Sequence, residues 1–247
     1  MKPEIKVLPD PAAVAREAAV EFVRLAATAI EQQGRCSIAL AGGSTPKSLY
    51  SLLADDESLR QQLAWDKLHF FWGDERHVPP DHQDSNYRMA REAMLAKVNL
   101  PPGNIHRIRS EVEDAQEAAD EYQQELGSFF QLEPDQLPRF DLVLLGMGPD
   151  GHTASLFPGT TALAETKRLV AATWVEKFNT YRITLTLPVI NNAANVIFLV
   201  CGSEKVEVLR TVLGQEASAP KFPAQLVQPI NGRLLWLLDA AAGVALN

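Results

Sequence analysis

The segment FDLVLLGMGPDGHTASLFPG, residues 140–159, holds the pattern that decides the fold. Its apolar run LVLL has the length of a buried strand and ends abruptly in a glycine-rich loop, residues 146–152. Asp150 and His152 lie two positions apart in that loop, where a carboxylate can orient an imidazole that accepts a proton. We therefore expect a strand that presents a histidine, followed by a short helix beginning at residues 153–156.

Similar apolar runs recur along the chain and alternate with segments of helical periodicity. We expect strands at residues 5–8, 36–41, 68–72, 105–108, 142–145, 169–175, 182–187, 196–200, 226–228 and 234–238. We expect helices at residues 11–33, 46–53, 86–97, 111–131 and 240–246, and one that follows residues 202–205 and ends near 213. This alternation predicts an α/β fold with a mostly parallel sheet and helices on both faces.

No repeat, low-complexity segment or Pro/Gly-rich break divides the chain. Residues 214–223 form the one sizeable flexible loop that the pattern predicts. We therefore expect a single domain over residues 1–247, which is long enough to bury a substantial core.

The composition excludes several classes of partner. A net charge of −8 would repel nucleic acid and anionic membrane surfaces. Neither of the two cysteines, Cys36 and Cys201, has a metal-type spacing, so we expect two buried thiols in a reducing compartment. Without a signal-type N-terminus or an apolar run of about 20 residues, the protein is expected to be soluble and cytoplasmic.

Four loops with unusual residues follow predicted strands. They are residues 42–45, 73–77, 146–152 and 202–205. Because ligands of open parallel sheets bind beyond the carboxyl ends of the strands, we expect these loops to converge on one site.

The first of these loops suits a phosphate group. It comprises Gly42, Gly43, Ser44 and Thr45, and Pro46 follows it. Backbone N–H groups, two hydroxyls and a helix N-terminus would come together there, with Thr45 as the expected N-cap. Arg182 and Lys205 can add positive charge. An ordinary turn with a threonine cap, flanked by solvated cations, is the competing interpretation.

The glycines of the opening segment also fit a dinucleotide-binding pattern, GxGxxG after a strand. Asp150 would place a carboxylate beside the pyrophosphate, however, and no acidic residue ends a strand about twenty positions later. The match is therefore a weak indication of a nicotinamide site.

His152 is the best catalytic candidate among the five histidines. A neutral imidazole at this position can take a proton from water, and the alternative is a histidine that caps the next helix. Ser155 could reach it from that helix, but no GxSxG elbow supports a covalent route. His77 and His82 lie in a polar loop whose spacing fits no usual zinc site, so no metal is expected.

Together these motifs resemble the family of 6-phosphogluconolactonases. The matching stretches are AGGSTP (residues 41–46), FFWGDERHVPP with DSNYRMA (70–90), LGMGPDGHTASLFPG (145–159), YRITLTLPVIN (181–191) and GSEK (202–205). The resemblance implies a three-layer α/β/α sandwich with a Rossmann-like sheet. It also implies hydrolysis of 6-phosphogluconolactone to 6-phosphogluconate, in the oxidative pentose phosphate pathway, without a cofactor.

The resemblance further implies roles for individual residues. Residues 42–45, Arg182 and Lys205 would hold the sugar 6-phosphate, and Asp74 and Arg76 would line the sugar or lactone end. His152 would be the general base, with Asp150 close by. The partner would be a small sugar phosphate, and we expect a monomer or weak homo-oligomer.

Related glucosamine-6-phosphate deaminases are similar in these loops, and a sugar-phosphate isomerase or deaminase stays an alternative. They carry GHIAFNEP in the third motif, with a glutamate that helps ring opening where this chain has Phe157. Their DEY triplet is replaced here by Asp74, Glu75 and Arg76. A non-catalytic sugar-phosphate sensor is a further alternative, although it would have no need for His152 beside Asp150.

Overall fold

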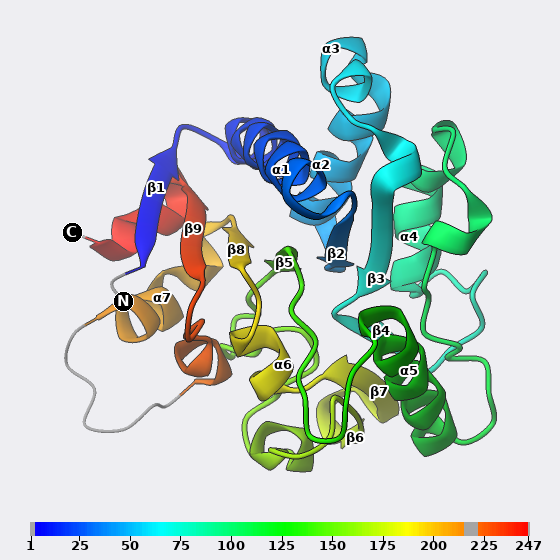
Figure 1. Cartoon of the computed structure of the whole chain (residues 1–247). Coiled ribbons are helices and arrows are strands. Elements are labelled where there is room, and N and C mark those ends of the chain that lie inside the picture. Colours follow the sequence, from blue (N-terminus) through cyan, green and yellow to red (C-terminus); the bar gives the residue numbers. More distant parts are fainter. Residues whose placement is uncertain (1–2, 215–221, 247) are drawn as a thin grey trace.

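The computed structural model describes residues 3–214 and 222–246, and its main element is a parallel sheet of six strands (Figure 1). In spatial order these strands are β1 (Glu4–Leu8), β9 (Arg233–Asp239), β8 (Asn195–Val200), β5 (Leu142–Leu145), β2 (Cys36–Leu40) and β3 (Leu68–Trp72). The predicted parallel α/β fold is confirmed. Most of the predicted loop at 214–223 lies outside the described residues.

Helices cover both faces of this sheet, as the side-chain alternation of its edge strand β1 shows. Lys6 extends toward α1 (Pro11–Gln33), where its Nζ lies 2.6 Å from Glu17 Oε1. Val7, the next residue, points the other way and packs against Gly243 of α8 (Ala240–Gly243). Because successive strand residues face opposite sides, α1 and α8 belong to opposite layers. The predicted three-layer arrangement is confirmed.

The strand order reverses beside β2. From β2 the chain first adds β3 at one edge, then returns to β5 on the other side and continues outward through β8 and β9. The loops that leave β2 and β5 therefore run in opposite directions and open a crevice between them. The four predicted loops follow the carboxyl ends of strands around this crevice.

A second, antiparallel sheet was not predicted. It contains β4 (Asp74–Arg76), β7 (Thr180–Leu185) and β6 (Val170–Val175), in that order. The polar triplet of β4 was predicted as a loop because it has no apolar alternation. Instead β4 pairs with β7, and Asp74 lies opposite Thr184 while Arg76 lies opposite Arg182. The pairing places charged residues from distant segments side by side.

The remaining helices agree with the predicted order but not always with the predicted ends. They are α2 (Ser44–Asp55), α3 (Glu57–Gln61), α4 (Asn86–Ala93), α5 (Ala115–Phe130), α6 (Leu187–Asn191) and α7 (Val206–Leu213). Short 3-10 helices lie at Trp65–Lys67, Leu95–Lys97, Pro102–Asn104, Thr161–Ala164, Glu176–Phe178, Ser203–Lys205, Pro223–Leu226 and Val244–Leu246. The helices α3 and α6 were not predicted.

Several predictions about single elements were wrong. Gly43, and not Thr45, is the N-cap of α2. Residues 153–156 form a tight turn closed by a bridge between Thr153 and Leu156, so no helix follows His152. Residues 105–108 contribute only one bridge, from Ile105 to Phe70, and residues 226–228 form no strand.

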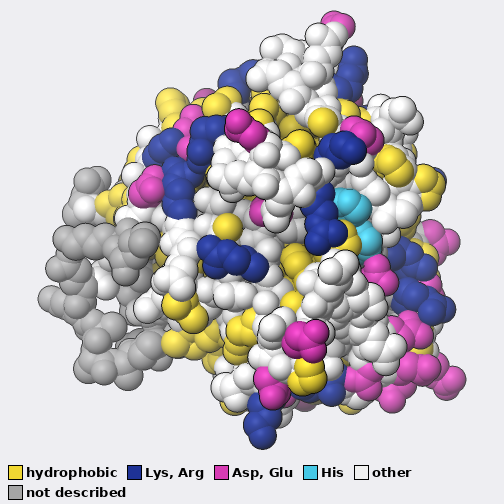
Figure 2. All heavy atoms as spheres, viewed as in Figure 1, with side chains coloured by type: hydrophobic (Ala, Val, Ile, Leu, Met, Phe, Trp, Pro, Cys, Tyr) yellow, Lys and Arg dark blue, Asp and Glu magenta, His cyan; other side chains and the backbone are white. Residues whose placement is uncertain are grey.

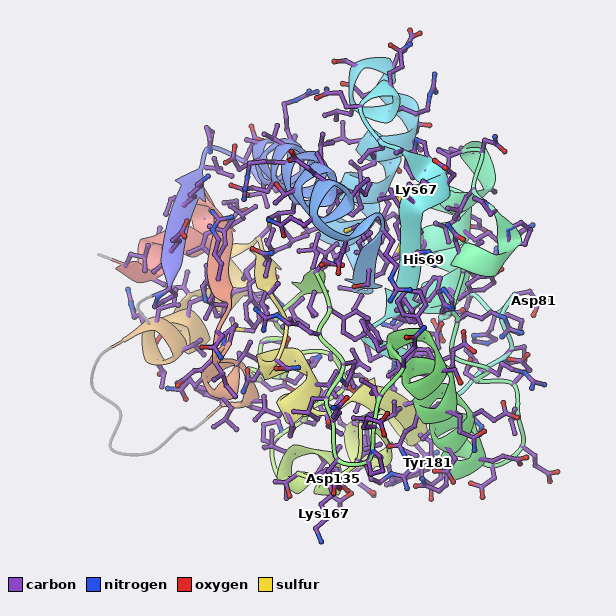
Figure 3. The ribbon with its side chains drawn as sticks, in the orientation of Figure 1. Lys67, His69, Asp81, Asp135, Lys167 and Tyr181 are labelled. Atoms are coloured by element: carbon purple, nitrogen blue, oxygen red, sulfur yellow. The ribbon has the colours of Figure 1, made fainter. Side chains whose placement is uncertain are left out.

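The helix α5 covers the small sheet, against β6 and β7 (Figure 1). Acidic side chains gather at the lower right of the face in Figure 2, where α5 and the segment leading into it lie. His69 points from β3 toward α5, and its ring contacts Phe129 at a centroid distance of 4.8 Å (Figure 3). Burial, followed by the charges of His106 and Arg35, lowers the pKa of His69 to about 4, so its imidazole is neutral and packs among aromatic rings.

Two buried tyrosine hydroxyls hold the backbone just before two of the site loops. Tyr50 of α2 accepts a hydrogen bond from the N–H of Ala41 and donates one to its carbonyl, both at 2.9 Å. Tyr122 of α5 does the same for Trp72, at 2.8 and 3.1 Å. Burial raises the pKa of both phenols, so the hydroxyls keep their protons. Each hydroxyl satisfies a donor and an acceptor where a strand ends.

We predict that Tyr50→Phe lowers the free energy of unfolding by about 1–3 kcal/mol, because it leaves the buried N–H and C=O of Ala41 unpaired. Urea denaturation followed by circular dichroism measures this change. Tyr181→Phe is the matched control, since this side chain is 44% exposed and its removal of a hydroxyl should change stability little. Equal denaturation midpoints for Tyr50→Phe and the wild type would contradict the proposed bridging role.

Candidate active site

The carboxyl ends of β2, β5 and β8 open onto a pocket of about 420 Å³. The predicted convergence of the four loops is confirmed, because each of them contributes to the pocket lining. The predicted site residues that line it are Gly42, Gly43, Ser44, Thr45, Asp74, Arg76, His152, Arg182 and Lys205. Asp150 lies behind His152, outside the lining. Cys201 also lines the pocket and is only partly buried, whereas Cys36 is buried as predicted.

The imidazole of His152 is held by two neighbouring groups. Its Nδ1 forms a short hydrogen bond with Oδ1 of Asp150, and its ring stacks on Phe157 at a centroid distance of 4.1 Å. Since a carboxylate only accepts, Nδ1 carries a proton, and in the neutral imidazole the lone pair is therefore on Nε2. His152 therefore presents a proton acceptor toward the pocket.

Asp150 is shared between His152 and a lysine that was not predicted. The Nζ of Lys177 lies 3.2 Å from Asp150 Oδ2. Burial raises the pKa of Asp150, but the hydrogen bond and charge of His152 and the hydrogen bond of Lys177 outweigh it and lower this pKa to about 2. The carboxylate is thus ionised at neutral pH.

Glycine is required at different positions of the loop 146–152 for different physical reasons. Only Gly151 has a left-handed backbone, with φ of 71°. At Gly148 the reason is space, because a Cβ would lie 2.1 Å from the Nδ1 and Cε1 atoms of His152. No helix begins after this loop, so it lacks the helix N-terminus that a dinucleotide pyrophosphate needs. The alternative of His152 as a helix cap is also wrong.

Asp74 is a buried carboxylate at the floor of the pocket. Its Oδ2 accepts a hydrogen bond from Ser155 Oγ at 2.6 Å, and the side chain of Asn86 donates to its backbone carbonyl at 2.9 Å. Ser155 was expected to reach His152 from a helix, but the turn after His152 directs it to Asp74 instead. The serine therefore connects the histidine loop to β4.

Glu75 points away from the pocket and fixes the helix that carries Asn86. Its carboxylate accepts hydrogen bonds from the N–H groups of Asn86 and Tyr87, both at 2.8 Å, at the start of α4. Burial raises the pKa of Glu75 against these bonds, which lower it. Adjacent acidic residues of β4 thus have different contacts, because a strand sends their side chains to opposite faces.

Arg76 and Arg182 lie directly opposite each other on β4 and β7. Both Nε atoms are buried without a hydrogen-bond partner among the described residues, and Arg76 also donates to the carbonyl of Asp84. Burial, followed by the charge of Arg76, lowers the pKa of Arg182. Two adjacent guanidinium groups without a carboxylate partner in the described chain favour an anion between or beside them.

The loop of residues 42–45 forms another wall of the pocket. Gly43 is the N-cap of α2, and no side chain accepts a hydrogen bond from the first N–H groups of this helix. Lys205 lies at the entry to α7, with its Nζ 3.6 Å from Glu204 Oε1. This arrangement of N–H groups, hydroxyls and a cation is suited to a phosphate.

Two residues of the β6–β7 connection were missed by the sequence analysis. Lys177 contacts Asp150, and Phe178 lines the pocket with its ring 5.2 Å from the guanidinium of Arg182. Their segment, EKFNT, has the composition of an ordinary polar hairpin. No signal in the sequence relates it to Asp150, because the contact exists only after the small sheet has formed.

In residues 3–214 and 222–246, no three His, Cys, Asp or Glu side chains are grouped so as to hold a metal ion. Over the same residues, no helix has the length and apolar character that crossing a membrane requires.

Comparison with known proteins identifies the family. The profile described as "Glucosamine-6-phosphate isomerases/6-phosphogluconolactonase" matches residues 9–236. A protein from Nostoc sp. named 6-phosphogluconolactonase is 48% identical over 248 residues, covering all of both chains. Another so named, from Synechocystis sp., is 46% identical and covers 98% of each chain.

Solved structures agree with this assignment. A 6-phosphogluconolactonase from Trypanosoma brucei is 35% identical, with a TM-score of 0.88, over 100% of this chain and 99% of its own. A monomeric glucosamine-6-phosphate deaminase, at 18% identity and a TM-score of 0.81, shares the fold. The chain therefore belongs to the family of glucosamine-6-phosphate isomerases and 6-phosphogluconolactonases.

Proposed function

We propose that this protein is a 6-phosphogluconolactonase that hydrolyses 6-phosphogluconolactone to 6-phosphogluconate, with His152 as the general base. The full-length relatives that carry this name support the reaction. The observation that carries the assignment of the base is the bond from His152 Nδ1 to Asp150, which leaves Nε2 free in the pocket. The reaction belongs to the oxidative pentose phosphate pathway and uses no metal or organic cofactor.

In the proposed mechanism, Nε2 of His152 removes a proton from a water whose oxygen attacks C1 of the lactone. The carbonyl becomes a tetrahedral oxyanion, and its collapse breaks the bond between C1 and the ring oxygen. The imidazolium then returns the proton to that oxygen, so one residue serves as base and then as acid. Asp150 stays ionised throughout and stabilises the transient imidazolium, as a carboxylate partner of a catalytic histidine does.

The oxyanion requires a hydrogen-bond donor close to C1. In the histidine loop, the N–H groups of Gly148 and Gly151 already donate to the carbonyls of His152 and Gly148. The donor is therefore Arg76 or another loop N–H group. Asp74, held by Ser155, is placed to accept a hydrogen bond from a sugar hydroxyl.

We assign the 6-phosphate to residues 42–45, Arg182 and Lys205. The start of α2 supplies N–H groups, and the two cations supply the charge that an acidic protein otherwise lacks. The sugar phosphate would then span the pocket from this loop to His152. We expect the enzyme to act in the cytoplasm as a monomer or weak homo-oligomer.

Phe157 argues against deaminase chemistry. A deaminase of this family needs an acidic group at this position to help open the sugar ring, and a phenyl ring has no proton to exchange. Here the ring stacks on His152 and restricts the rotation of the imidazole. With Phe157 in place of the deaminase glutamate, His152 is the one group at this side of the pocket that we expect to move a proton. Release of ammonia from glucosamine 6-phosphate would be the result that favours the alternative.

We predict that His152→Ala lowers kcat/KM by about 10²- to 10⁴-fold, the usual contribution of a general base. Acid release from freshly made 6-phosphogluconolactone, followed in a pH-stat, measures the rate after subtraction of spontaneous hydrolysis. His82→Ala is the control, because this side chain is 42% exposed and lies outside the pocket lining. Near-normal activity of a folded His152→Ala variant would contradict the assignment of His152 as the general base.

We predict that Arg182→Ala raises KM for 6-phosphogluconolactone by about 10- to 100-fold, the range for losing a hydrogen bond to a charged group. The KM for unphosphorylated gluconolactone should change far less, since it has no phosphate. Arg210→Ala, in the exposed part of α7, controls for the loss of one positive charge. If both substrates were affected equally, Arg182 would have no specific role in binding the phosphate.

A further inference from the structure

The contact between Lys177 and Asp150 joins two segments that are distant in sequence. Lys177 lies in the short helix Glu176–Phe178, which connects β6 to β7, whereas Asp150 lies in the loop after β5. One oxygen of the carboxylate binds His152 Nδ1, and the other lies 3.2 Å from Lys177 Nζ. Asp150 therefore bridges a histidine that can be charged and a lysine that always is near neutral pH.

An ionised carboxylate that binds a histidine favours the protonated imidazole. Such a partner orients His152, but it also opposes the neutral form that must accept a proton from water. Lys177 counteracts the second effect in two ways. Its ammonium group partly neutralises the carboxylate, which weakens the attraction between Asp150 and a protonated imidazole. The ammonium group also repels a positive charge on the imidazole directly.

We propose that Lys177 is a positioning residue that binds the second oxygen of the Asp150 carboxylate, opposes a positive charge on His152 and so favours the transfer of a proton from water to its imidazole. This inference rests on the proposed function, in which His152 is the general base. It gives the β6–β7 connection a specific role in the reaction, which is to balance the charge of the carboxylate that orients the imidazole.

Other charges also face His152 across the pocket. They come from β4 (Asp74 and Arg76), from β7 (Arg182) and from the segment after β8 (Glu204 and Lys205). Among the described residues, none of these groups forms an ion pair or a hydrogen bond with Asp150. Their influence on His152 stays constant when Lys177 is replaced, so a variant at this position isolates its contribution.

Lys177 also has a packing environment that a test must control. Its Nζ lies 5.4 Å from the ring centroid of Phe178, and that ring lies 5.9 Å from Phe157, which stacks on His152. Lys177→Met keeps a side chain of similar length and removes only the charge. Lys177→Arg keeps the charge. The side chain is 56% exposed, so both variants are expected to fold.

The experiment follows the imidazole signals of His152 by NMR as a function of pH, and measures kcat/KM over the same range. His152→Ala identifies the signals. For Lys177→Met we expect the titration midpoint to move upward by about 0.5–1 pH unit, from the loss of Coulomb repulsion between two partly exposed charges that bind the same carboxylate. At the acid end of the profile, kcat/KM should fall by about 3- to 10-fold, while the rate at high pH stays unchanged.

Two variants separate this effect from general changes. Lys177→Arg should restore both the titration midpoint and the rate profile. Lys167→Met removes an equal charge from a side chain that points into solvent at the lower edge of the molecule, and it should leave both unchanged (Figure 3). Low ionic strength is used because an exposed charge pair is screened by salt.

An unchanged NMR midpoint in Lys177→Met would overturn the inference, whatever the activity of His152→Ala. A uniform fall of the rate at every pH would also overturn it, because that is the effect of a packing role. A midpoint that moves without a matching move of the rate profile would support the coupling of Lys177 to His152 and contradict His152 as the base. The two proposals can therefore fail separately.

Discussion

The constraint on which the structure depends is the reversal of strand order at β2. All six strands of the main sheet are parallel, so every carboxyl end lies at the same edge. A crevice opens only where neighbouring connections leave in opposite directions, which is between β2 and β5. The loop of residues 42–45 and the loop of His152 form the two sides of this crevice, and the fold thereby determines where chemistry can occur.

The small antiparallel sheet supplies the arginine side chains of the pocket. Pairing of β4 with β7 places Arg76 beside Arg182, two like charges that the described structure leaves without a carboxylate. A protein with a net charge of −8 attracts anions poorly at long range, but this local concentration of positive charge compensates within the pocket. Asp74 of the small sheet is held in turn by Ser155 and Asn86.

The neighbours of His152 fix the orientation of its imidazole and place a negative and a positive charge beside it. Phe157 covers one face of the ring, Asp150 fixes the tautomer, and Lys177 engages the other oxygen of that carboxylate. The segment that carries His152 thus supplies both groups that contact the imidazole, and the β6–β7 connection supplies the lysine behind them. Such preorganisation is valuable because a catalytic group that is already oriented need not be reorganised during the reaction.

The sequence by itself determined the main sheet, most of its helices and the residues around the pocket. Buried parallel strands are continuous apolar runs, and the loops after them carry glycine, hydroxyl and charged residues that stand out locally. Asp150 and His152 were recognised as a pair because they lie two positions apart in one of these loops. Their roles, and those of the other site residues, remain predictions.

Only the tertiary structure decided the second sheet, the direction of Ser155 and the contact of Lys177 with Asp150. The strand β4 is too short and polar to be recognised, because its stability comes from pairing with β7 about a hundred residues later. Ser155 turns toward Asp74 because the chain after His152 forms a turn and not a helix. Contacts between distant segments leave no periodic signal in the sequence, and they depend on the packing of the whole chain.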